Sequence, residues 1–218
     1  MVDGDSTRLR IDVGAGASSY VSSQSSAKIY RSPRGTQADV EVRVAPGGLL
    51  ILDPDPVVCL AGSRYRQRQV VDLADGAGFV LVDWLTSGRR ASGERWAFES
   101  YEGRIEIRDR ARLIVHESLV LRSSDGPLEA RMGRFDVLAV VVVAGAMLLE
   151  EAISIVGHVA KVRARRRAEQ LISAAGLERG GCVVRIAGRS VEHVRHAIQD
   201  CLRWVPDRLG DDPWRRKW

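Results

Sequence analysis

The chain has 218 residues, of which 45% are hydrophobic and 28% are charged, as is typical of one folded domain or two small ones. Its net charge of +5 is modest and argues against a strongly basic nucleic-acid binder. The scattered Cys59, Cys182 and Cys201 predict neither a disulfide framework nor a structural zinc site. The amino terminus lacks the apolar core of a secretory signal. The longest uncharged apolar run, residues 137–149, is too short to span a bilayer, so we expect a cytoplasmic protein.

The first two thirds of the sequence alternate between apolar and charged residues. This pattern covers residues 8–13, 39–44 and 104–108, and it is typical of half-buried strands. Glycine and proline turn signals separate these segments at short intervals. The continuous β-branched run at residues 137–143 predicts a strand that is buried on both faces. Residues 1–145 are therefore expected to form a β-rich body, and the fold class is mainly β.

The pattern changes after residue 146. Apolar residues at helical spacing, with Glu150 and Glu151 in the first turn, predict a helix over about residues 147–175. Residues 182–187 read as one strand, and Ser190 is a candidate N-cap for a second helix that ends near Trp204, before Pro206. We therefore expect a small α/β portion at 146–206, in which two helices flank one strand and pack on the body. Residues 207–218 are expected to be a C-terminal tail, either disordered or docked on a partner.

Four histidines are the first candidates for chemistry. His193 and His196 are three residues apart and either share a metal site or are two exposed polar residues on a helix; we favour the second interpretation because no ligand set completes the first. His158, in the first predicted helix, is expected to be structural. His116 precedes Glu117 in a predicted strand, so one of the two faces inward and needs a partner. This pair is the only local hint of an enzyme, because the common catalytic motifs are missing and no catalytic residue is predicted.

A cluster of five cations is the most strongly charged segment. Its members are Lys161, Arg163, Arg165, Arg166 and Arg167. They predict either a patch for an acidic partner or nucleic acid, or a solvated helix end whose cations complement the helix dipole. No aromatic stacking pattern accompanies the cluster, which argues against nucleic acid.

Several longer segments carry a family resemblance. They are SSQSSAKIYR at 22–31, GDSTRLRIDVGAGA at 4–17, LLILDPDPVVCLAGSRYRQRQVVDL at 49–73 and VDWLTSGRRASGERWAF at 82–98, followed by weaker matches at 129–145 and 182–194. In this combination and order the chain resembles the UreD family of urease accessory proteins, called UreH in some organisms. The family usually carries further strands before the segment that begins at Gly4, and their absence would expose a sheet edge.

The resemblance implies a β-solenoid-like stack of strands with a small helical portion. It also implies a non-catalytic metallochaperone or scaffold that acts with apo-urease, UreF and the GTPase UreG to insert nickel into urease. No permanent cofactor, nucleic acid or membrane is implied; the ion is transient cargo that passes through an internal route.

An internal route for Ni²⁺ needs nitrogen or oxygen donors that bind weakly enough to release the ion. The acidic residues on the matching segments are candidates to line it: Asp53, Asp55, Asp83, Glu94 and Glu117. The alternative for each is an ion pair with Arg89, Arg90 or Arg95, or a turn cap at one of the two Asp-Pro steps. The sequence assigns no partner-binding residues, and Trp84, Trp96 and Tyr65 are expected to be core or interface anchors.

Overall fold

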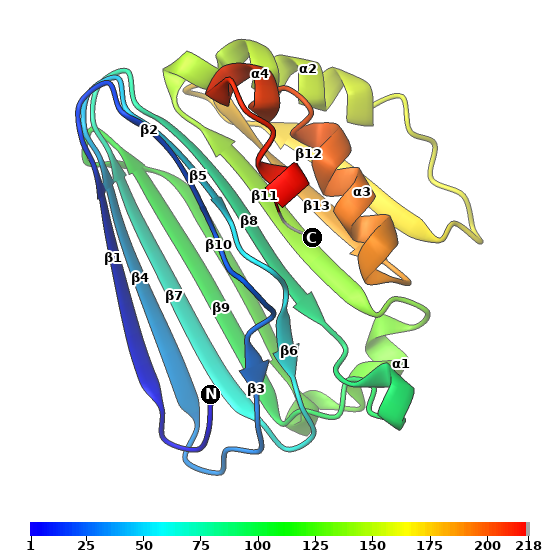
Figure 1. Ribbon diagram of the computed structural model, residues 1–218. Helices are drawn as coiled ribbons and strands as arrows, with labels where there is room; N and C mark the ends of the chain where they lie inside the picture. The colour runs from blue at the N-terminus through cyan, green and yellow to red at the C-terminus, as the bar shows by residue number, and fades with distance from the viewer. Residues whose placement is uncertain (217–218) are drawn as a thin grey trace.

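The computed structural model describes residues 1–216, and its elements form three layers (Figure 1). Two β-sheets pack face to face, and helices cover the outer face of the second sheet. Strands make up 44% of the chain and helices 20%. The prediction of a mainly β fold is therefore confirmed.

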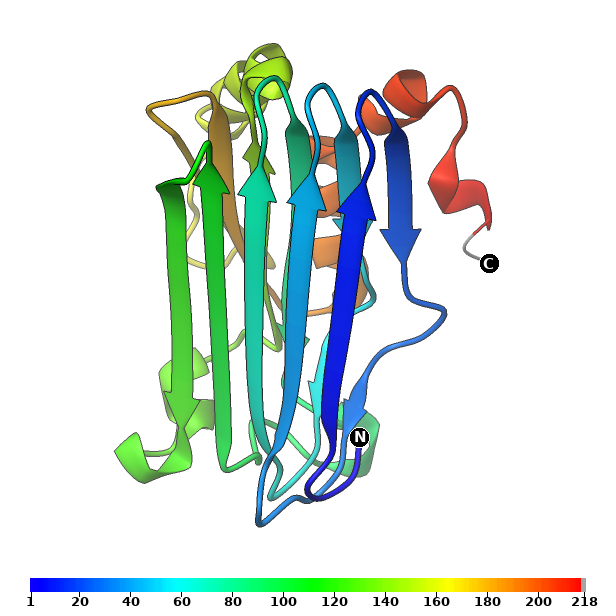
Figure 2. The same ribbon diagram turned by 90° about the vertical axis from the view of Figure 1, so that its left-hand side faces the viewer.

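The first sheet has the order β1-β4-β7-β9-β10. Its strands are β1 (Ser6–Val13), β4 (Thr36–Val44), β7 (Arg64–Leu73), β9 (Ser100–Asp109) and β10 (Arg112–Arg122). The first four are parallel, and β10 returns antiparallel to β9 (Figure 2).

The second sheet has the order β12-β13-β11-β8-β5-β2, with β3 and β6 beside it. Its strands are β2 (Ser18–Ser22), β3 (Lys28–Ile29), β5 (Leu49–Asp53), β6 (Val57–Cys59), β8 (Gly78–Thr86), β11 (Val137–Ala144), β12 (Gln170–Gly176) and β13 (Gly181–Gly188). The chain alternates between the two sheets up to β8, but β11, β13 and β12 pair antiparallel. A solenoid-like stack is therefore not confirmed.

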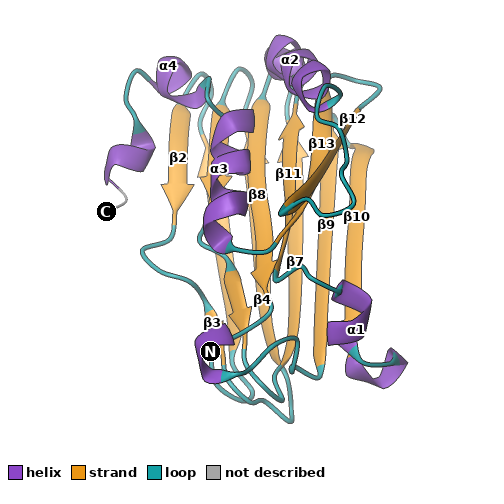
Figure 3. Cartoon of the chain, turned by 90° about the vertical axis from the view of Figure 1, so that its right-hand side faces the viewer, coloured by secondary structure: helices purple, strands orange, loops and turns teal. Residues whose placement is uncertain are grey.

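Strand β11 is buried on both faces, as its β-branched run predicts. Val141 and Val143 pack against the helices, whereas Val142 and Ala144 pack against the first sheet. The covering helices are α2 (Leu149–Val159) and α3 (Val191–Cys201), which lie across the outer face of the second sheet (Figure 3). Both faces of β11 exclude water, which explains the absence of polar residues along it.

The prediction of one helix over residues 147–175 is wrong. Helix α2 ends at Val159, and β12 occupies Gln170–Gly176. The free edge of β13 explains the difference, because β12 pairs with it along its whole length. The α/β portion therefore holds two strands rather than one.

Between residues 147 and 216 the structure has three α-helices rather than the two predicted. Ser190 is the N-cap of α3, as predicted, because its Oγ accepts a hydrogen bond from the backbone N–H of His193 at 3.3 Å. Pro206 does not follow the last helix; it lies in the first turn of α4 (Val205–Leu209), where a proline has no N–H to leave unpaired. The remaining helix, α1 (Leu128–Met132), lies between β10 and β11.

The segment after α4 was expected to be disordered or docked on a partner, but its Trp214 contacts the body of the same chain. Trp214 packs against the core beneath the helices, and its Nε1–H donates to Asp53 Oδ2 at 3.2 Å. Residues 217–218 of the predicted tail lie outside the described residues. No helix within residues 1–216 is long and apolar enough to cross a membrane.

Candidate functional site

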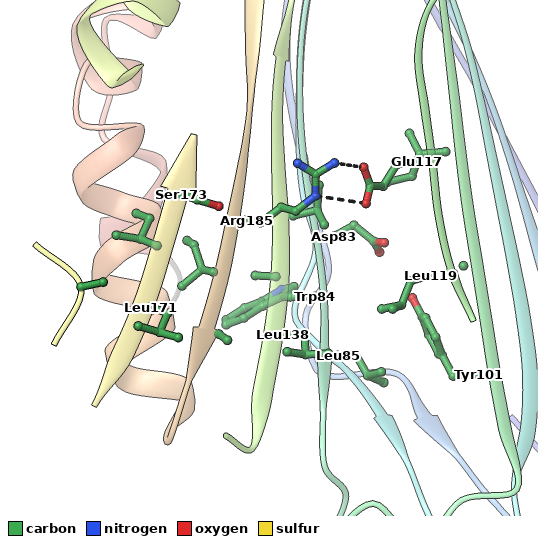
Figure 4. Close-up of a pocket in the computed structure, with 18 residues that line it drawn as sticks. Asp83, Trp84, Leu85, Tyr101, Glu117, Leu119, Leu138, Leu171, Ser173 and Arg185 are labelled. Atoms are coloured by element: carbon green, nitrogen blue, oxygen red, sulfur yellow. Dashed lines mark hydrogen bonds and ion pairs between the residues drawn. The ribbon is translucent and has the colours of Figure 1, made fainter. Parts of the chain in front are cut away.

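A cavity of about 460 Å³ lies between the two sheets. Apolar side chains form most of its wall, among them Leu85, Leu119 and Leu138. Asp83, Glu117 and Arg185 are the charged residues that line it (Figure 4). Two of the five acidic residues proposed from the sequence are thus brought into one space.

Strand register explains why these residues meet. On the second sheet, Arg185 of β13 pairs with Val140 of β11, which pairs with Asp83 of β8. On the first sheet, Glu117 of β10 pairs with Ile105 of β9. Since alternate residues of a strand face the same side, each row points into the space between the sheets.

The Asp83 carboxylate is enclosed by protein, and the surface that it keeps faces the cavity. Gln67 Nε2 donates to Asp83 Oδ1 at 2.9 Å, and Tyr65 donates its hydroxyl to Gln67 Oε1 at 2.9 Å. Burial raises the pKa of Asp83 to about 6, although hydrogen bonds from Gln67 and Gln69 oppose the rise. The group is therefore mostly ionised at neutral pH and titrates just below it.

Glu117 forms an ion pair with Arg185 across the gap between the sheets (Figure 4). The guanidinium donates two hydrogen bonds to the carboxylate, and the one from Nε to Oε1 measures 3.3 Å. The neighbouring His116 is exposed on the opposite face of β10. The sequence prediction that one member of this pair faces inward is confirmed, and the inward member is Glu117.

Asp53 and Asp55 lie on the other side of the second sheet, near α3. Both are buried. Tyr20 donates its hydroxyl to Asp53 Oδ2 at 2.6 Å, and burial together with this carboxylate raises the pKa of Tyr20. Ser23 donates to Asp55 Oδ2 at 3.1 Å, while Arg195 lies 3.7 Å from Asp55 Oδ1. These two carboxylates have polar anchors and do not line the cavity between the sheets.

The model of the UreD urease accessory protein family matches residues 1–218. The chain belongs to the UreD family. A urease accessory protein UreD of Sorangium cellulosum (strain So ce56) is 45% identical over 218 residues, covering 100% of this chain and 69% of that protein. The urease accessory protein D of Arabidopsis thaliana is 31% identical over 241 residues, covering 98% of this chain and 82% of that protein.

Glu94 of this UreD family member lies apart from the cavity. It forms an ion pair with Arg89, which is the alternative considered for it, and it accepts a hydrogen bond from the backbone N–H of Ala61 at 3.3 Å. The guanidinium of Arg89 lowers the pKa of Glu94. This carboxylate is therefore held in its charged form by a surface partner.

Sequence reasoning missed several polar residues. Arg90 and Arg95 pair with Asp136, which was not considered, at 3.0 Å and 2.5 Å. The inward-facing Gln67 and Gln69 were also missed, although they share the period-two register of the buried Tyr65 and Val71. The alternation of buried and exposed residues along β7 is a signal that could have identified Gln67 and Gln69 as inward-facing. The expected anchors Trp84, Trp96 and Tyr65 are all buried, as predicted.

Among residues 1–216, no group of three or more His, Cys, Asp or Glu side chains is arranged to hold a metal ion. His193 and His196 are exposed on α3. The cavity instead presents one carboxylate on each wall. Such an arrangement suits brief contact with a cation better than permanent binding.

Proposed function

We propose that this UreD family chain is a non-catalytic scaffold for urease maturation that works with UreF and UreG, and that nickel passes through the cavity between its sheets. Membership in a urease accessory family supports the role in maturation. The observation that carries the nickel route is Asp83. Its carboxylate is enclosed in the cavity wall, and within the described residues only neutral amides hydrogen-bond to it.

A partly buried carboxylate that has no cationic partner within residues 1–216 is unfavourable for folding, so a role in binding a cation accounts for its position. Ni²⁺ accepts carboxylate and amide oxygens as ligands. The apolar walls keep the local dielectric low, which strengthens the attraction between Asp83 and an incoming cation. Glu117 on the opposite wall is the second donor, and the ion displaces Arg185 from it in passing.

Release is as important as binding for a conduit. A site with several strong ligands would retain the ion, whereas single carboxylates on two walls allow it to move on. The Arg185 side chain returns to Glu117 once the ion has left. The route therefore works without any bond of a substrate being made or broken.

The test compares Asp83→Asn with Glu94→Gln. Each variant is combined with apo-urease, UreF, UreG, GTP and nickel, and the nickel content of urease is measured by mass spectrometry. Asp83→Asn is expected to lower nickel loading several-fold while the complex still forms on size-exclusion chromatography. Glu94→Gln is the matched control, because its carboxylate lies at the surface with Arg89, and it is expected to load normally.

Normal nickel loading by Asp83→Asn would refute the route through this cavity. Failure of the unaltered chain to bind either UreF or apo-urease, with its fold intact, would refute the scaffold role. The two results are independent, because complex formation and nickel content are measured separately.

A further inference from the structure

The five-cation cluster lies in the loop that joins α2 to β12, here called the basic loop (residues 160–169). All five side chains are exposed, and none forms an ion pair with another described residue. Because the loop also contains Glu169, its formal charge is +4, against +5 for the whole chain. The loop stands out from the body beside the start of β12 (Figure 1). Most of the excess positive charge of the protein is therefore concentrated on one projecting segment.

The basic loop borders the cavity between the sheets at its open side. The first sheet ends at β10, whereas the second continues through β13 to β12. The inward face of β12 is therefore left uncovered, and Leu171 on that face is 37% exposed. Ala164 of the basic loop lines the same cavity, and Val162 beside it is 48% exposed. Positive charge and exposed apolar side chains thus meet at one opening.

We propose that the basic loop and Leu171 form a docking surface for an acidic segment of a partner protein that also carries apolar side chains. The acidic side chains pair with the cations of the loop, and the apolar ones cover Val162 and Leu171. The loop contains no aromatic side chain on which a nucleic-acid base would stack. The exposed Val162 and Leu171 cannot form favourable contacts with a charged phosphate backbone. The proposal goes beyond the nickel route, since it names the chemistry and position of a partner.

Physical chemistry predicts two separable contributions to this binding. Exposed charge pairs are individually weak, but several together steer association and weaken with salt, because the screening length is about 10 Å at 0.1 M ionic strength. Apolar contact at Leu171 is insensitive to salt at these concentrations. Variants of the loop and of Leu171 should therefore change different properties of the same complex.

The probe is a short fluorescein-labelled peptide in which Glu and Leu alternate, and its binding is followed by fluorescence anisotropy at several salt concentrations. The test variant replaces the five cations of the loop with Gln. The matched control replaces one exposed lysine and four exposed arginines elsewhere, none of which forms an ion pair with a described residue: Arg8, Lys28, Arg31, Arg43 and Arg104. Both variants remove the same formal charge, so only its location differs.

We expect the loop variant to bind the peptide at least about tenfold more weakly than the control and to lose most of the salt dependence. Leu171→Ser is expected to weaken binding several-fold with an unchanged salt dependence. Equal binding by the loop variant and the control would overturn the proposal. The proposal would also be overturned if a single-stranded DNA of equal charge bound more tightly than the peptide, with an affinity that falls in the loop variant and is unchanged by Leu171→Ser. Circular dichroism confirms that each variant is folded, and nickel loading is not used as a readout.

Discussion

The substitution Asp83→Asn is expected to stabilise the protein in a pH-dependent manner. Folding raises the pKa of Asp83 from 3.8 to about 6, chiefly because burial disfavours the charged form. The folded state therefore binds this proton more tightly than the unfolded state. The resulting stabilisation is complete below the unfolded pKa and is lost as the pH rises through about 6.

The size of the effect follows from the shift. Two pKa units correspond to about 3 kcal/mol, and because the carboxylate borders a cavity we take about 2–3 kcal/mol. Asparagine has nearly the same shape, has no charge at any pH and keeps an oxygen that accepts the hydrogen bond of Gln67. The variant therefore escapes the penalty that the native chain suffers above the folded pKa.

The measurement is chemical denaturation of both proteins at about pH 4.5 and about pH 8. The difference in unfolding free energy, variant minus native, is expected to grow by about 1.5–2 kcal/mol between the two values, because pH 4.5 lies above the unfolded pKa and the rest of the effect develops below it. Using a difference removes the contributions of the other titrating groups, which are common to both proteins. A constant difference across this range would refute the electrostatic account of Asp83. Greater stability with poorer nickel loading is typical of a group retained for function.

Two further predictions concern stability. A double-mutant cycle with Glu117→Gln and Arg185→Met should give a coupling energy of about 1 kcal/mol for the Glu117–Arg185 ion pair. The value is modest because the arginine side chain is partly exposed. Strictly additive effects of the two substitutions would contradict this prediction. Gly145→Ala should cost more than about 3 kcal/mol by thermal denaturation, since a Cβ would lie 2.1 Å from the carbonyl oxygen of Ala77. Gly126 has a similar φ of 113° but open space around it, so Gly126→Ala should cost only about 1–2 kcal/mol; equal losses would exclude the clash as the cause.

Local periodicity predicted the strands well and the second helix nearly as well, because these elements are specified by their own residues. The incorrect prediction of a helix over residues 147–175 shows the limit of local periodicity as a guide to structure. The predicted apolar face of this helix comprises Leu148, Ile153, Val156, Val159 and Val162. Leu148 and Val159 are buried as expected, but Ile153 is 64% exposed and Val162 is 48% exposed. The residues after the basic loop pair with β13. Strand β12 forms a hairpin with β13, in which Gly176 pairs with Cys182 and Gln170 with Gly188. Helical spacing of apolar residues around position 172 carries no information about this pairing.

The candidate site was predictable as a set of residues but not as an arrangement. Asp83 and Glu117 face the same cavity because the register runs through three strands of the second sheet, β8, β11 and β13, and Arg185 of β13 pairs with Glu117 of β10 in the first sheet. A slip of one residue in any strand would turn its acid to the opposite face. The sequence alone cannot supply that register, which is why Glu94 was grouped with them although it lies elsewhere.

The partners of the carboxylates, more than their burial, separate a conduit from a structural cluster. Asp53 is held by the hydroxyl of Tyr20 and the indole of Trp214, so a cation would have to break several fixed contacts to reach it. Among the described residues, Asp83 is held by the neutral amides of Gln67 and Gln69 alone. Exchanging the Gln67 contact for nickel adds charge neutralisation, because no cationic side chain within residues 1–216 pairs with Asp83. The same exchange at Asp53 would leave buried hydroxyl and indole donors unpaired, and for that reason the ion is expected to follow the side of the sheet that faces Glu117.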